Sequence, residues 1–131
     1  MKELYLRAKE AREKAYAPYS TFKVGAAVLT ANNHIYSGCN IENAAYPSSC
    51  CAERVALFQA IAHGETHFQA IMIVADTKRP VPPCGACRQV MSEFFTEHTA
   101  IHMATLEGEI KTMTMNDILP LSFQKGDLHS H

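Results

Sequence analysis

The chain has 131 residues, of which 47% are hydrophobic and 19% are charged. This composition is typical of one globular domain over residues 1–131 and excludes a disordered tail protein and a fibrous one. Lysine and arginine total 12 against 13 acidic residues, which leaves a net charge of −1 and no basic excess for binding nucleic acid. No apolar run approaches the ~20 residues of a membrane span, and the charged first dozen residues argue against a signal peptide. We therefore expect a cytoplasmic protein without a membrane partner.

The first forty residues predict a helix followed by a hairpin. Residues 3–16 are rich in helix-forming residues with an apolar face, and Pro18 should end this helix. Residues 22–29 form a short apolar run typical of a buried strand. Asn32 and Asn33 favour a turn, after which residues 34–37 should return as the partner strand.

Two further helices are predicted, and each begins at a cysteine. Residues 51–62 are apolar nearly all round, with Ser48 or Ser49 as a candidate N-cap and Gly64 near the C-terminus. A second helix runs from Cys84 to about residue 98 and follows Pro83, a residue common at helix starts. We expect these two helices to lie side by side.

The remaining strands define the fold class. Residues 70–74, 100–105 and 109–113 are the candidates, and the last two are separated by about three residues. A parallel crossover needs a dozen or more residues, so these two strands should pair antiparallel. Thr114 and Asp117 then favour the capping of a short helix. The prediction is α/β: a three-layer α/β/α sandwich with a mixed five-stranded sheet and a mobile tail from about residue 127, which includes His129 and His131.

Five cysteines, an odd number, argue against a disulfide framework. Two motifs stand out, Cys51-Ala52-Glu53 and Pro83-Cys84-Gly85-Ala86-Cys87. Thiolates are favoured at helix starts, so two such starts aimed at one point would gather the sulfurs of Cys51, Cys84 and Cys87. Three protein ligands hold Zn²⁺ with one coordination position open, as in catalytic zinc sites. The sequence therefore predicts one Zn²⁺ per chain.

Charged residues next to these cysteines suggest further roles. Glu53 lies two residues from a ligand and is the candidate general acid and base. Three thiolates around Zn²⁺ leave a surplus negative charge. We predict that Arg54, Arg88 or both donate hydrogen bonds to the sulfurs and offset this charge.

Other interpretations of the cysteines stay open at this point. A Cys-x-x-Cys pair also occurs in redox motifs and in half zinc fingers. A structural zinc site with four ligands could take its fourth sulfur from Cys39 or Cys50. Both of these cysteines are more typical of packing residues, and no histidine has a ligand spacing to the cysteines.

From about residue 16 to residue 128 the chain resembles the cytidine deaminases of the small, homotetrameric, three-cysteine type. Six segments carry the resemblance: residues 16–20 (YAPYS), 22–27 (FKVGAA), 38–46 (GCNIENAAY), 51–54 (CAER), 83–90 (PCGACRQV) and 119–123 (LPLSF). Zinc-dependent base deaminases share such a pair of motifs.

The resemblance implies roles for residues outside the two cysteine motifs. Asn40 and Glu42 match the pair that binds the ribose hydroxyls, and Phe22 matches an aromatic residue of the pyrimidine pocket. The backbone N–H of Ala52 is a candidate contact to the base. Tyr46 and Phe123 match residues that a neighbouring protomer contributes, so the resemblance implies a homotetramer.

The implied reaction is the hydrolytic deamination of cytidine, and of 2′-deoxycytidine, to uridine and ammonia in pyrimidine salvage. Water adds to C4 of the ring. Glu53 takes a proton from this water and delivers it to N3, and it later protonates the departing amino group so that ammonia leaves. The alternatives are a deaminase for a cytosine antibiotic of the blasticidin S type, a polynucleotide-editing deaminase, and a non-catalytic zinc module for protein association.

Overall fold

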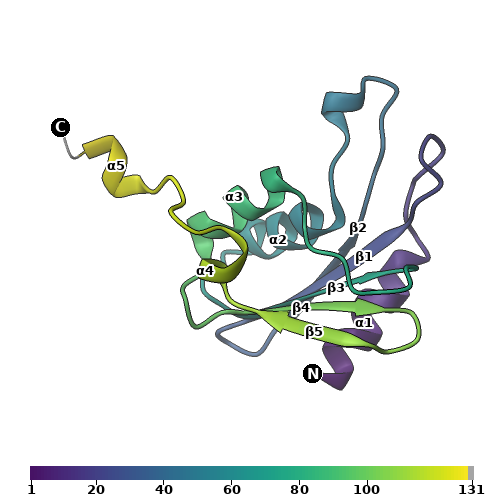
Figure 1. Cartoon of the computed structure of the whole chain (residues 1–131), viewed down its shortest axis with the longest axis horizontal. Helices are drawn as coiled ribbons and strands as arrows, with labels where there is room; N and C mark the ends of the chain where they lie inside the picture. The colour runs from purple at the N-terminus through teal and green to yellow at the C-terminus, as the bar shows by residue number, and fades with distance from the viewer. Residues whose placement is uncertain (130–131) are drawn as a thin grey trace.

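The computed structural model describes residues 1–129, and these residues form one mixed five-stranded sheet with helices on both faces (Figure 1). The strand order is β2-β1-β3-β4-β5, in which only β3 and β4 pair parallel. The antiparallel pairing predicted for the last two strands is confirmed. The strands are β1 (Val24–Thr30), β2 (Ile35–Cys39), β3 (Phe68–Ala75), β4 (Ala100–Thr105) and β5 (Ile110–Met113).

Helices on the two faces of the sheet form the outer layers of the predicted three-layer sandwich, while the last helix projects from the body of the domain (Figure 1). The helices are α1 (Lys2–Arg12), α2 (Ala52–Ala62), α3 (Gly85–Phe94), α4 (Met115–Ile118) and α5 (Lys125–His129), with a 3-10 turn at Tyr46–Ser48. Leu4 and Ala8 of α1 are buried against one face of the sheet. Leu57 of α2 and Met91 of α3 are buried against the other face. The sheet therefore places α2 and α3 together on one side (Figure 1).

Two glycines let the helices approach the sheet closely. A Cβ atom at Gly38 of β2 would lie 2.5 Å from the backbone nitrogen of Ala56 in α2. A Cβ atom at Gly25 of β1 would collide with the carbonyl oxygen of Ala8 in α1. Any larger residue at these positions would push a helix away from the sheet.

Several predicted boundaries differ from the structure. Helix α1 ends at Arg12 instead of residue 16, because Tyr16 pairs with the segment after β2. The N–H of Tyr16 donates to the Asn40 carbonyl at 3.0 Å, and the carbonyl of Tyr16 accepts from the N–H of Glu42 at 2.8 Å. This contact between distant segments outweighs the local helix propensity.

The ends of the cysteine-bearing helices also differ from the prediction. Neither Ser48 nor Ser49 caps α2, whose N-cap is Cys51 itself. Helix α3 ends at Phe94, before a loop in which Thr99 accepts a hydrogen bond from the N–H of Thr96. The capping box predicted for Thr114 and Asp117 is present at the start of α4.

The predicted mobile tail from about residue 127 begins inside α5, and His131 lies outside the described residues. No helix within residues 1–129 is both long and apolar enough to cross a membrane.

Candidate active site and metal centre

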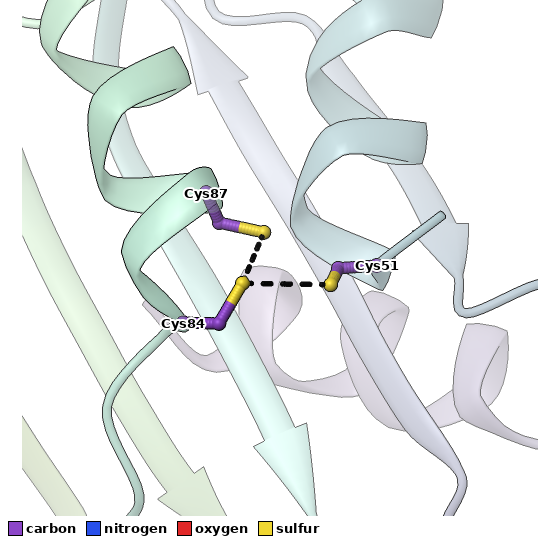
Figure 2. Close-up of side chains that lie close together, drawn as sticks. All are labelled: Cys51, Cys84 and Cys87. Atoms are coloured by element: carbon purple, nitrogen blue, oxygen red, sulfur yellow. Dashed lines mark hydrogen bonds between the residues drawn. The ribbon is translucent and has the colours of Figure 1, made fainter. Parts of the chain in front are cut away.

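The sulfurs of three cysteines converge between the N-termini of α2 and α3 (Figure 2). Cys51 is the N-cap of α2, Cys84 is the N-cap of α3, and Cys87 lies in the first turn of α3. The Sγ atoms of Cys51 and Cys84 are 3.7 Å apart, and those of Cys84 and Cys87 are 3.4 Å apart. All three sulfurs lie within 4.8 Å of one another.

These distances suit a tetrahedral zinc ion. Zn–S bonds of about 2.3 Å at tetrahedral angles place neighbouring sulfurs about 3.8 Å apart. Within residues 1–129 no fourth cysteine, histidine or carboxylate joins this group, so Cys39 and Cys50 lie outside it. A site with three protein ligands leaves one coordination position for water or substrate, unlike a closed structural site.

The pKa values of the Cys51 and Cys87 thiols are shifted in opposite directions. Hydrogen bonds from Cys87, Arg54 and Cys84 lower the pKa of Cys51 to about 5. The same interaction with the Cys51 thiolate, together with burial, raises the pKa of Cys87. The cluster therefore favours a thiolate at Cys51, the sulfur at the start of α2, where the helix dipole also stabilises negative charge.

Arg54 supplies a positive charge directly at the cluster. Its Nη2 donates to the Sγ atom of Cys51 at 3.6 Å, because residues three apart lie on the same face of a helix. The thiolate in turn raises the pKa of the guanidinium. Its Nε atom is buried and has no hydrogen-bond partner among the described residues. Arg54, one of the two arginines for which a bond to the sulfurs is predicted, therefore lies against the sulfur of Cys51.

Arg88, the other arginine considered for this role, bonds backbone carbonyls in the structure. Its Nε donates to the carbonyl of Pro83 at 2.7 Å, and its Nη1 donates to the carbonyl of Ile118 at 2.8 Å. Successive side chains on a helix diverge by about 100°, so following Cys87 in the sequence does not bring Arg88 to the same place.

Glu53 is a buried carboxyl group next to the sulfur cluster. Only 6% of the residue is exposed, although it lies in the first turn of α2. Burial raises the pKa of Glu53 to about 7, and the charge of the Cys51 thiolate adds to this rise. Both protonation states of this carboxyl are therefore accessible near neutral pH, as a group that accepts and returns a proton requires.

Asn40 and Glu42 hold the loop that carries Phe22. The N–H groups of Tyr19 and Ser20 donate to Oε1 of Glu42, and the Ser20 hydroxyl donates to Oε2. The side-chain amide of Asn40 accepts from the N–H of Val24 at 2.9 Å and donates to the carbonyl of Phe22 at 2.8 Å.

These bonds leave each side chain with capacity for a ligand. Asn40 uses one of its two N–H donors within residues 1–129, and the carboxylate of Glu42 retains acceptor positions. The bonds from Ser20 lower the pKa of Glu42, which keeps its carboxylate charged.

The other predicted substrate-binding residues differ in exposure. Ala52 is fully buried in the first turn of α2, while Phe22 is 42% exposed. Tyr46 (68% exposed) lies on the segment that projects between β2 and α2, and Phe123 (58% exposed) lies on the extended segment before α5 (Figure 1).

Residues 1–111 match the family described as the cytidine and deoxycytidylate deaminase zinc-binding region. The chain belongs to this deaminase family. It is 48% identical to a cytidine deaminase of Sporosarcina psychrophila over 128 residues, which cover 98% of this chain and 94% of the relative. It is 50% identical to a cytidine deaminase of Halalkalibacterium halodurans over 120 residues, which cover 92% and 91%.

A solved structure supports the same deaminase fold. The crystal structure of a cytidine deaminase from Burkholderia pseudomallei matches with a TM-score of 0.90 at 47% identity. The match covers 93% of this chain and 98% of that chain. The family is a zinc-binding one, and the cluster of Cys51, Cys84 and Cys87 is the place in this deaminase where the ion fits.

Sequence reasoning gave no separate role to Ser20, although its hydroxyl and its N–H both bind Glu42. The signal available was weak, since a serine in a loop before an apolar strand is commonplace. The sequence also indicated no separate role for Gln89, whose side chain donates to the carbonyl of Phe123 at 2.9 Å.

Proposed function

We propose that this protein catalyses the zinc-dependent hydrolytic deamination of cytidine and 2′-deoxycytidine to uridine and ammonia. The observation that carries the proposal is the buried carboxyl of Glu53 beside three sulfurs arranged for an ion with an open position. Cys51, Cys84 and Cys87 would hold the ion. When bound, zinc would supply Lewis-acid activation of water.

Glu53 would be the proton carrier of the reaction. It would accept a proton from the attacking water and deliver it to N3 of the ring. It would then take the remaining proton of the hydroxyl formed at C4 and give it to the amino group, which leaves as ammonia while the C4 carbonyl forms. One carboxyl can serve both steps because it returns to its ionised form after the first transfer and can accept the second proton. Its burial keeps bulk water from competing for that proton.

Asn40 and Glu42 would bind the hydroxyl groups of the sugar. A free N–H of Asn40 and an acceptor position of Glu42 can share one hydroxyl, which is both a donor and an acceptor. These residues also hold the Phe22 loop, so sugar binding and the position of Phe22 beside the pyrimidine would be linked. The N–H of Ala52 would contact the base.

A homotetramer would complete the site. Tyr46 and Phe123 are exposed on two segments that project from the body of the domain, and Leu121, two residues before Phe123, is fully exposed. Large apolar side chains exposed in this way mark surfaces that contact another molecule. We propose that Tyr46 and Phe123 reach the sites of neighbouring protomers.

The cellular setting is part of the proposal. A nucleoside deaminase with five free cysteines suits a reducing cytoplasm and a role in pyrimidine salvage. The balanced charge favours a free nucleoside over a polynucleotide. A deaminase of a blasticidin S type antibiotic would use the same zinc chemistry on a different substrate, so an assay with both substrates distinguishes the two functions.

The test is an ultraviolet assay of the purified protein with cytidine. We expect the absorbance of cytidine to fall as uridine forms, and we expect a strong chelator to stop the reaction until Zn²⁺ is restored. Parallel reactions contain 2′-deoxycytidine, blasticidin S or a cytosine-containing single strand. Zinc-loaded protein that consumes only the antibiotic or only the strand would contradict the proposed substrate.

Replacing Arg54 with Ala should lower turnover about 10- to 100-fold, the usual effect of losing a hydrogen-bond partner of a metal ligand. The reason is the bond from Arg54 to the Cys51 sulfur, which offsets part of the negative charge of the thiolates. The measurement is kcat with cytidine, and circular dichroism establishes that the variant is folded. Unchanged turnover in a folded, zinc-loaded variant would show that the charge of Arg54 is dispensable.

A further inference from the structure

The side chain of Arg88 connects two segments of backbone that are far apart in the sequence. Its Nε donates to the carbonyl of Pro83, and its Nη1 donates to the carbonyl of Ile118 at the end of α4. The neighbouring Gln89 donates to the carbonyl of Phe123. Two successive residues of α3 thus hold both ends of residues 118–123.

The bond to Pro83 lies directly before a candidate zinc ligand. Residues 76–84 form neither helix nor strand, and Cys84 is the last residue of this stretch. Within residues 1–129, the backbone of residues 80–83 takes part in one hydrogen bond, which is the bond from Arg88 to the Pro83 carbonyl. Because the Pro83 carbonyl belongs to the peptide unit that leads into Cys84, this bond fixes the direction from which Cys84 enters the cluster.

The chemistry of Arg88 suits such a role. A guanidinium is planar, so two acceptors bound to its Nε and Nη1 are held in a fixed relation to each other. Arg88 forms no ion pair with a carboxylate in the part of the chain that the structure describes. Its interactions are therefore with backbone carbonyls, whereas Arg54 contacts a sulfur directly.

We propose that Arg88 is a positioning residue of the zinc site. It fixes Cys84 through the Pro83 carbonyl, and its second bond, to the Ile118 carbonyl, holds the guanidinium in place for that contact. The inference rests on the zinc site in the proposed function and extends it to a residue that touches neither the sulfurs nor the substrate. Loss of such an outer partner typically weakens metal affinity 10- to 100-fold.

The test compares Arg88→Met and Arg88→Lys with the matched control Gln89→Ala. The control removes a bond to residues 118–123 without touching Pro83. Zinc affinity is measured by equilibrium competition with a chromophoric chelator, and thermal midpoints are measured with and without Zn²⁺. We expect Arg88→Met to bind Zn²⁺ about 10- to 100-fold more weakly. Arg88→Lys should fall between Arg88→Met and the unaltered protein, because an ammonium lacks the planar fork, and Gln89→Ala should keep the original affinity.

Each outcome bears on the proposal. Unchanged zinc affinity in Arg88→Met, with a lower thermal midpoint of the zinc-free protein, would show a purely structural residue and overturn the inference. Equal losses of affinity in Arg88→Met and Gln89→Ala would also overturn it, since the Pro83 bond would not be the cause. If Arg88→Met does not fold, the zinc affinity of Arg88→Lys is used instead, and an affinity equal to that of the unaltered protein would overturn the inference. The competition needs no substrate, so failure to deaminate cytidine would contradict only the proposed function.

Discussion

Replacing Glu53 with Gln is expected to remove nearly all turnover of cytidine while Zn²⁺ stays bound. Glutamine keeps the size of the side chain and can still form hydrogen bonds, but it cannot carry a proton. General acid–base catalysis contributes about 10²- to 10⁴-fold to rates, and Glu53 would act in both proton transfers, so the loss should lie at the upper end. The measurement is kcat by the ultraviolet assay, together with zinc content by atomic absorption.

The control for this variant is Glu65→Gln, which changes another carboxylate with little exposed side-chain surface. Glu65 bonds with His34 and Asn32 of the β1–β2 turn and lies outside the sulfur cluster. We expect Glu65→Gln to retain the original kcat. Substantial turnover in a zinc-loaded Glu53→Gln protein would contradict the role of Glu53 as proton carrier.

Replacing Cys87 with Ala should abolish zinc binding and, with it, deamination. Cys87 is fully buried, and its sulfur lies 3.4 Å from that of Cys84. Two sulfurs alone make a poor zinc site, because structural and catalytic sites use three or four protein ligands. Zinc that binds only the folded state raises the thermal midpoint. The variant should therefore lose both its bound zinc and the shift of its thermal midpoint on zinc addition.

Cys50→Ala is the matched control, since Cys50 is the sequence neighbour of Cys51. Its sulfur lies outside the cluster, and burial raises the pKa of its thiol, which disfavours the thiolate that a metal needs. Zinc content and turnover should be unchanged in this variant. Zinc loss in Cys50→Ala together with zinc retention in Cys87→Ala would show that the ligand set is wrong.

Much of the fold could be predicted because its strands are short apolar runs with clear boundaries. Strand β4 matches its predicted residues, and the short connection to β5 required the antiparallel pairing that is observed. The end of α1 could not be predicted in the same way. Helix propensity continues to residue 16, but the backbone of Tyr16 pairs with residues 40–42, a contact between segments that local sequence does not reveal.

The candidate side chains for the proposed chemistry can be named from local sequence. Cysteines at two helix starts and a glutamate two residues after the first of them limit the possible sites, because helix geometry fixes the directions of neighbouring side chains. The spacing of Cys84 and Cys87 brings their sulfurs together through one helical turn.

The partners of the polar residues around the cluster depend on how segments far apart in the sequence pack together. Arg88 directly follows Cys87 in the sequence and Arg54 lies three residues after Cys51, yet Arg54 contacts a sulfur and Arg88 contacts two carbonyls. In the same way, Asn40 and Glu42 proved to hold the loop that carries Phe22. The reason is physical: a long or polar side chain takes whichever partner the packing of distant segments brings within hydrogen-bond distance, and local sequence does not specify those segments.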